Sequence, residues 1–127
     1  MSIQLINSPE APAAVGPYSH ASRVGDLLLC SGQIPLDPET MKVVEGGIEA
    51  QAKQVFANIE AVLQTVGATF DQVAKCTVFL TDLGDFPVVN TLYAEAFGEH
   101  KPARSTFEVS ALPLGCAIEI EVIADLS

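Results

Sequence analysis

The most regular hydrophobic pattern in the chain lies between the pair Gly46-Gly47 and the single Gly67. Within residues 48–66, apolar side chains recur every three or four positions, which predicts an amphipathic helix with one face in the core. The glycine that follows is a typical C-terminal stop signal. The apolar positions are Ala52, Val55, Phe56, Ile59, Val62, Leu63 and Val66.

A second, shorter helix is expected between Asp82 and Gly98. Either Asp82 or Asp85 can cap its first turn, Pro87 is tolerated near its start, and the glycine ends it. The expected buried stripe of this helix consists of Val88, Leu92, Ala96 and Phe97.

Six segments rich in β-branched and apolar residues are expected to form strands. They are residues 2–6, 18–24, 27–31, 73–81, 103–109 and 117–124. Gly25-Asp26 provides a two-residue turn that joins the second and third into a hairpin. The order β-β-β-α-β-α-β-β predicts an α+β fold in a single domain, residues 1–127, with one mixed β-sheet and two helices on one face.

Charged and apolar residues alternate in the last two strands. Glu119 and Glu121 alternate with aliphatic residues, so both carboxylates lie on one face of the sheet. The preceding strand carries Arg104, Thr106 and Glu108 at alternate positions. If these strands pair as a hairpin with their apolar faces matched, the five polar residues share the face away from the helices.

Such a face has two interpretations. It can be a solvated surface with weak cross-strand ion pairs. It can also be a subunit contact or a ligand cleft, where the arginine holds a substrate carboxylate and a glutamate orients or deprotonates water. The pattern alone leaves both open.

Composition narrows the classes of function. The 127-residue chain has 16 acidic and six basic residues and a net charge of -10, so we do not expect a nucleic-acid partner. Its three cysteines form no CxxC pair, and its two histidines lie near no metal-ligand partner, so no metal site is expected. Motifs for nucleotide cofactors and zinc deaminases are missing, so no cofactor is expected either. Without a membrane-length apolar run or a leader-like N-terminus, we expect a cytoplasmic protein with no membrane contact.

Several separated motifs occur in a characteristic order. They include Gly16-Pro17-Tyr18-Ser19, Ser31-Gly32-Gln33-Ile34-Pro35, the strand end at 77–83, and Asn90 with Tyr93. The most specific piece runs from Pro102-Ala103-Arg104-Ser105-Thr106 to Ile118-Glu119-Ile120-Glu121. Over essentially its whole length, the chain resembles the reactive intermediate deaminase family, also called the Rid, RidA or YjgF family.

The resemblance implies a chorismate-mutase-like subunit in a homotrimer, with the helix-free sheet faces around the three-fold axis and a cleft between each pair of subunits. It implies hydrolysis of reactive 2-imino acids and their enamines, such as 2-iminopropanoate and 2-iminobutanoate, to 2-oxo acids and ammonia. No metal or organic cofactor takes part in that reaction.

The resemblance also implies roles for individual residues. Arg104 would bind the substrate carboxylate, Glu119 would position and activate water, and Tyr18 of an adjacent subunit would close the pocket. The substrate would be held by Ser31, Gly32, the backbone near Thr106 and, more weakly, Asn90. Thr106 stands where many relatives have a cysteine, so thiol-based redox activation is not expected, and Ala111 stands where relatives often have a second arginine.

Other interpretations of the same residues stay open. The chain could be a non-catalytic trimer that binds small carboxylates and regulates a partner; ribonuclease activity is disfavoured by the charge. Tyr18 could simply bond to backbone, Ser31 could only form a turn, and Asn90 could lie on a helix surface. We expect His20 at the surface.

Overall fold

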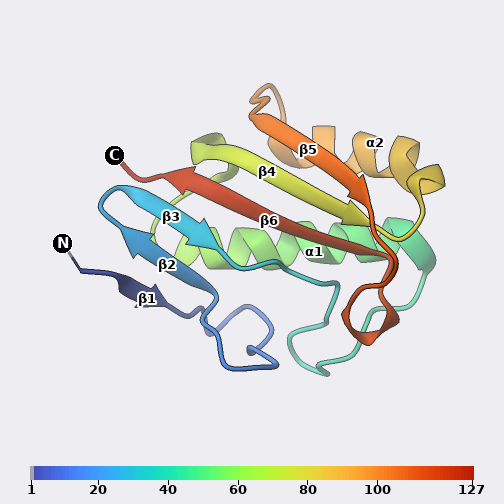
Figure 1. Cartoon of the computed structure of the whole chain (residues 1–127), viewed down its shortest axis with the longest axis horizontal. Coiled ribbons are helices and arrows are strands. Elements are labelled where there is room, and N and C mark those ends of the chain that lie inside the picture. Colours follow the sequence, from blue (N-terminus) through green and yellow to red (C-terminus); the bar gives the residue numbers. More distant parts are fainter. Residues whose placement is uncertain (1) are drawn as a thin grey trace.

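A computed structural model describes residues 2–127, in which one mixed sheet of six strands is backed by two helices (Figure 1). The strands are β1 (Gln4–Ile6), β2 (Ala21–Val24), β3 (Leu27–Cys30), β4 (Val73–Leu80), β5 (Ala103–Glu108) and β6 (Ile118–Asp125). The helices are α1 (Gly47–Thr65) and α2 (Phe86–Phe97), both behind the sheet in Figure 1. Three short 3-10 turns lie at Phe70–Gln72, Leu83–Asp85 and Pro113–Gly115. The α+β fold expected from the sequence is confirmed.

The strands lie in the order β1-β2-β3-β6-β4-β5, and every neighbouring pair is antiparallel except β4 and β5. The parallel pair is joined by α2, in keeping with the need of parallel strands for a long crossover. The hairpin between β2 and β3 forms as expected, because Gly25 adopts a positive φ of 59° and Val24 pairs with Leu27.

The second strand was expected to begin at residue 18, but it begins at Ala21. The backbone before Ala21 makes no sheet hydrogen bonds, because the N–H of Tyr18 donates to the carbonyl of Gly16. The N–H of His20 is donated to the side chain of Asn7 instead of to a sheet partner. Residues 18–20 therefore form a hydrogen-bonded loop that leads into the first residue of β2.

The core lies between the helices and the sheet. Helix α1 buries the face expected from its periodicity, including Val55, Ile59 and Leu63. The expected stripe of α2 is partly wrong, because Val88 is 40% exposed whereas Val89 is only 2% exposed. This helix carries apolar residues at eight of its twelve positions, so two stripes were possible. Aromatic packing selects the one with Tyr93 and Phe97, whose rings stack with centroids 4.4 Å apart.

The expected hairpin between the last two strands is wrong, because β4 lies between β5 and β6. Arg104 is in register with Cys76 and Thr106 with Val78, both of which point into the helix-covered core. Arg104, Thr106 and Glu108 therefore lie on the helix side of β5. Glu119 and Glu121 pair with Phe79 and Thr77 of β4 and lie on the uncovered face. The prediction of which sheet face each residue of β5 occupies was wrong because β5 is an edge strand. Its apolar residue Phe107 is exposed and does not mark the side of the core.

The uncovered sheet face carries apolar as well as polar side chains. Leu27, Leu29 and Phe107 are 46%, 41% and 52% exposed on it. Beside them Lys75 of β4 donates a hydrogen bond of 2.9 Å to the hydroxyl of Ser105 on β5. Large exposed apolar side chains of this kind are typical of an interaction surface.

Candidate functional site

Arg104 is the most unusual cation of the described chain. It is partly buried, and its guanidinium carbon lies 4.7 Å from the centre of the Tyr93 ring and 5.3 Å from that of Phe86. No ion pair or side-chain hydrogen bond to the guanidinium occurs among residues 2–127. Arg23, in contrast, donates to the carbonyl of Gly25 and lies 3.6 Å from the Asp26 carboxylate. Arg104 is thus held in place by aromatic rings while its N–H donors stay free for an anion.

Helix α2 brings a polar residue to the same place. Phe86, Asn90 and Tyr93 are spaced by four and three residues, so they share the face of α2 that meets Arg104. Thr106 lies two residues further along β5, on the same side of the strand. We call these five residues the arginine cluster: Phe86, Asn90, Tyr93, Arg104 and Thr106.

Glu119 lies against the backbone of Gly32. Gln33 and Ile120 exchange backbone hydrogen bonds of 2.8 and 3.2 Å, which set Gly32 beside Glu119. A Cβ at position 32 would overlap Oε2 of Glu119 and lie 2.9 Å from its Cδ. Burial raises the pKa of the Glu119 carboxyl, and the nearby charge of Glu121 raises it further. A carboxyl with a raised pKa is suited to accept and return a proton.

Ser31 and Tyr18 lie next to this pair. The hydroxyl of Ser31 donates to the carbonyl of Ser19 at 2.7 Å, and its N–H donates to the carbonyl of His20 at 2.9 Å. Tyr18 is 47% exposed and lines the same small hollow as Gly32. Its hydroxyl accepts a hydrogen bond from the N–H of Val15 at 3.3 Å, so the backbone contact anticipated for it exists. We call Tyr18, Ser31, Gly32 and Glu119 the glutamate cluster.

His20 organises the loop around the glutamate cluster and is not at the surface, as had been expected; it is only 3% exposed. Its Nδ1 accepts from the N–H of Ser8 at 2.9 Å, which leaves Nε2 to donate to the carbonyl of Pro12 at 2.7 Å. Two backbone groups of the entry loop are thereby bound to one ring. The pattern of apolar and polar residues around His20 in the sequence does not predict its burial.

The two clusters do not meet within one chain. Arg104 lies on the helix side of the sheet and Glu119 on the uncovered face, with β4 between their strands. Their positions along β4 differ by three residues, from Cys76 to Phe79. With strands about 4.8 Å apart and a rise of about 3.3 Å per residue, their Cα atoms are separated by roughly 14 Å. The expectation that both groups share one sheet face is wrong.

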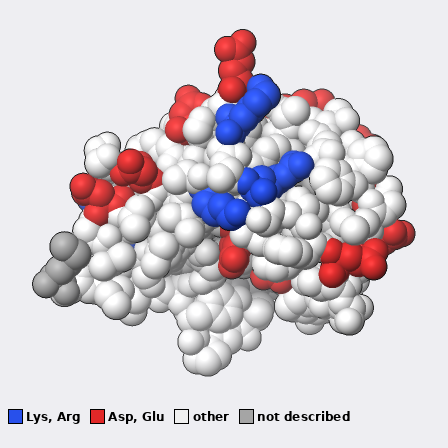
Figure 2. All heavy atoms as spheres, turned by 45° about the horizontal axis from the view of Figure 1, so that its top comes forward, with Lys and Arg blue, Asp and Glu red and all other residues white. Residues whose placement is uncertain are grey.

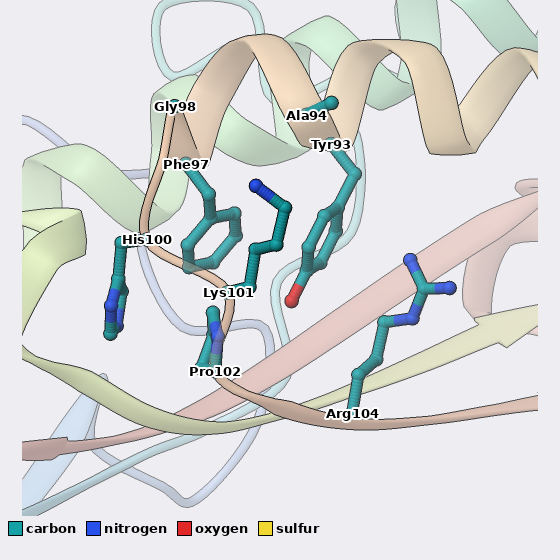
Figure 3. A pocket seen from close by; sticks show the side chains of 8 residues that line it. All are labelled: Tyr93, Ala94, Phe97, Gly98, His100, Lys101, Pro102 and Arg104. Atoms are coloured by element: carbon teal, nitrogen blue, oxygen red, sulfur yellow. The ribbon is translucent and has the colours of Figure 1, made fainter.

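Arg104 lies among basic side chains and beside a pocket. Figure 2 shows basic side chains grouped on the side that carries β5 and α2, with acidic side chains around them. A pocket of about 400 Å³ opens there between the end of α2 and the start of β5 (Figure 3). Tyr93, Phe97, Lys101 and Arg104 are among its lining residues.

Within residues 2–127, no three His, Cys, Asp or Glu side chains gather as ligands for a metal ion. None of the helices in that range combines the length and apolar composition that crossing a bilayer requires.

The fold and motifs define a known class of small proteins. A family model described as endoribonuclease L-PSP matches residues 8–126, and the chain therefore belongs to this family, which includes proteins named RutC family and reactive intermediate deaminase. The protein DfrA of Myxococcus xanthus is 51% identical over 126 residues, which is 98% of this chain and 96% of that protein. A mouse protein named 2-iminobutanoate/2-iminopropanoate deaminase is 43% identical over 121 residues, 95% of this chain and 90% of its own. The crystal structure of RidA from an Antarctic Psychrobacter superposes with a TM-score of 0.93 at 47% identity, covering 96% of this chain and 98% of that one.

Proposed function

We propose that the protein hydrolyses 2-imino acids, including 2-iminopropanoate and 2-iminobutanoate, to 2-oxo acids and ammonia. The observation that carries the proposal is the free guanidinium of Arg104, stacked on aromatic rings and without a carboxylate partner in the described chain. Membership of a family with relatives named as imine deaminases supports the same reaction.

The active unit in this proposal contains more than one copy of the chain. The arginine and glutamate clusters lie on opposite sides of the sheet, so a single chain does not hold both against one small substrate. In a homotrimer, the arginine cluster of one subunit faces the glutamate cluster of its neighbour, with Tyr18 closing the cleft from that neighbour. The apolar side chains Leu27, Leu29 and Phe107 on the uncovered face support such an assembly.

The chemistry follows from the two clusters. Arg104 holds the carboxylate of the substrate in a bidentate pair, which fixes the C=N bond in the cleft. The imine reacts in its protonated form, with the proton taken from solvent. Glu119 accepts a proton from water as the water oxygen bonds to the carbon of this protonated imine, and the C=N double bond becomes a single bond to an NH2 group. Glu119 then gives its proton to that nitrogen, the C–N bond breaks, ammonia leaves, and the hydroxyl group releases its proton to solvent as the carbon–oxygen double bond of the 2-oxo acid forms. The net change is the addition of one water and the loss of one ammonia.

The test generates 2-iminopropanoate in place with an amino-acid oxidase and traps the surviving imine with semicarbazide. Wild-type protein lowers the trapped signal. Arg104→Ala loses this activity by about 100-fold or more, because charge-assisted hydrogen bonds contribute roughly 1.5–3 kcal/mol each. Arg104→Lys keeps the positive charge but loses the paired N–H donors of the planar guanidinium, so it retains only part of the activity. Full activity in Arg104→Ala, with the fold and oligomer intact, contradicts the carboxylate role.

Binding without turnover is the other outcome to measure. Calorimetry with pyruvate shows whether the arginine cluster takes a small carboxylate. If pyruvate binds and no imine is hydrolysed, the protein is a carboxylate-binding regulator. RNA cleavage, which the description of the family model names, finds little support in a net charge of -10. Salt-sensitive RNA binding in a gel shift would reopen it.

A further inference from the structure

The connection between β1 and β2 is long and contains no helix or strand. It comprises residues 7–20, and most residues of the stretch 13–18 are exposed. Within residues 2–127, the only hydrogen bonds of residues 13–17 are two local ones with Tyr18. Segments with few buried contacts and few hydrogen bonds to the rest of a fold are its most mobile parts. The stretch that brings Tyr18 to the glutamate cluster therefore depends on how its two ends are held.

The ring of His20 joins those two ends. Its Nε2 donates to the carbonyl of Pro12 at 2.7 Å, which closes residues 12–20 into a loop. The backbone of His20 is itself fixed, because its carbonyl accepts from the N–H of Ser31 at 2.9 Å and its N–H donates to Asn7 at 3.1 Å. Since Ser31 belongs to the glutamate cluster, the ring holds the start of the exposed stretch against that cluster.

The two hydrogen bonds of the ring differ in what depends on them. Ser8, which donates its N–H to Nδ1 at 2.9 Å, is also held by its hydroxyl, which donates to the carbonyl of Ala61 in α1 at 3.2 Å. Between Pro12 and Tyr18, in contrast, no other hydrogen bond within residues 2–127 ties the chain to a second element. His20 and Tyr18 also line the same small hollow. The bond to Pro12 is thus the one that limits where Tyr18 lies.

From this geometry we propose that His20 is a positioning residue for the reaction, which acts through its Nε2 bond to Pro12 and holds Tyr18 where it closes the cleft. The proposal rests on the proposed function, because it takes Tyr18 as a wall of that cleft. His20 does not touch the substrate. Its neutral ring, with the proton on Nε2, sets the position of a loop that the core does not hold.

The experiment separates the two ring bonds with two neutral amides. His20→Gln places an amide nitrogen near the position of Nε2, so it can donate to Pro12 but not accept from Ser8. His20→Asn places an amide oxygen near the position of Nδ1, so it can accept from Ser8 but not reach Pro12. Each variant loses one hydrogen bond of the ring, so the two should lose similar amounts of stability.

A control outside the site removes a comparable bridge. Gln72 also joins two backbone groups, because it accepts from the N–H of Thr69 at 3.1 Å and donates to the carbonyl of Asp125 at 3.3 Å. Asp125 is the last residue of β6, whereas Glu119 lies near the start of that strand. Gln72→Ala should therefore leave the rate of imine hydrolysis unchanged.

Hydrolysis is measured by semicarbazide trapping on variants that elute as the wild-type oligomer. We expect His20→Asn to lower kcat by about tenfold or more, because a misplacement of about 1 Å in an active site can cost about 100-fold. KM should change little, since Arg104 still anchors the carboxylate. His20→Gln should keep its rate within about threefold of the wild type, because the bond that places Tyr18 is retained.

A double variant tests whether the effect passes through Tyr18. In a Tyr18→Ala background, His20→Asn should cost less than about twofold, because the side chain that it misplaces is gone. Equal losses in His20→Gln and His20→Asn overturn the proposal. Full activity in His20→Asn, or a loss of the same size with and without the Tyr18 ring, also overturns it.

A second readout does not need activity. The chain has two tyrosines, Tyr18 and the buried Tyr93, so protein labelled with fluorotyrosine gives two fluorine NMR signals, which Tyr18→Phe assigns. His20→Asn should move the Tyr18 signal toward that of free fluorotyrosine and leave the Tyr93 signal in place, whereas His20→Gln should move neither. If the wild type hydrolyses no imine, the proposed function fails, and this spectrum still decides the role of His20. An unmoved Tyr18 signal in His20→Asn overturns it.

Discussion

The contact between Gly32 and Glu119 offers a sharp test of where the carboxyl must be. Gly32→Ala adds one methyl group, which would overlap Oε2 of Glu119 and lie 2.9 Å from Cδ and 3.1 Å from Cγ. The φ of Gly32 is outside the left-handed region, so the backbone accepts alanine. The carboxyl is the mobile end of a half-buried side chain and must move by more than about 1 Å to regain van der Waals spacing.

The change should therefore separate rate from stability. Overpacking costs about 1–3 kcal/mol in a rigid core, but here the flexible side chain gives way. The loss of unfolded-state freedom in Gly→Ala offsets about 0.4–1 kcal/mol of that cost. We expect the free energy of unfolding to change by less than about 1 kcal/mol on this balance. A misplacement of about 1 Å in an active site can cost about 100-fold in rate, equivalent to about 2.7 kcal/mol of transition-state stabilisation.

The measurements are urea unfolding and imine hydrolysis by semicarbazide trapping. Gly16→Ala is the matched control, because its Cβ would lie an ordinary 3.4 Å from Cε2 of Tyr18 and its φ is also unstrained. A double variant, Gly32→Ala with Glu119→Gln, should be no slower than Glu119→Gln alone if the methyl acts only through the carboxyl. Full activity in Gly32→Ala, or additive losses in the double variant, would refute the reasoning.

Three further predictions concern stability and are measured by urea unfolding. Glu119→Gln should raise the free energy of unfolding at neutral pH, because the raised pKa means that the folded state disfavours the ionised carboxyl. The gain should shrink as the pH falls through the raised pKa toward the ordinary glutamate value and vanish below it, and a gain that grows on acidification would contradict the cause. Tyr93→Phe should change the free energy of unfolding by less than about 1 kcal/mol, since within residues 2–127 the buried hydroxyl has only the Cys76 thiol, a weak hydrogen-bonding group, as its partner; a loss of about 2 kcal/mol or more would contradict this. Asn58→Leu should cost about 2–4 kcal/mol, because Nδ2 donates to the carbonyls of Ile34 and Leu36 at 3.2 and 3.0 Å; a cost below about 1 kcal/mol would show that water replaces these bonds.

The local sequence pattern predicted an element well wherever residues within that element determine its structure. The periodicity over residues 48–66 places α1 to within a residue at each end, and Gly25 marks the first hairpin. The pattern failed where a second element decides. Which stripe of α2 is buried depends on the stacking of Tyr93 with Phe97, and no spacing rule chooses between two apolar stripes.

The candidate site shows the same division. The sequence singles out Arg104 and Glu119 by charge and motif. The structure leaves the Arg104 guanidinium without an ion pair among residues 2–127, and burial raises the pKa of the Glu119 carboxyl. The sequence could not show that Arg104 and Glu119 lie on opposite faces of the sheet. The strand order decides which face each residue of β5 occupies, and that order depends on contacts between segments distant in the sequence. The aromatic rings that orient Arg104 were also missed as part of the site, although Phe86 and Tyr93 are seven residues apart in one helix.

The placement of the two clusters on opposite sides of the sheet has a genetic consequence. If each cleft takes Arg104 from one subunit and Glu119 from the next, Arg104→Ala and Glu119→Gln are defects in different halves of the same cleft. Two inactive variants, unfolded together and refolded as mixed trimers, should then complement each other. Random assembly from equal amounts would restore about a quarter of the clefts, since each needs one particular neighbour on each side. In a cell carrying both alleles, two damaged genes would yield a partly working protein.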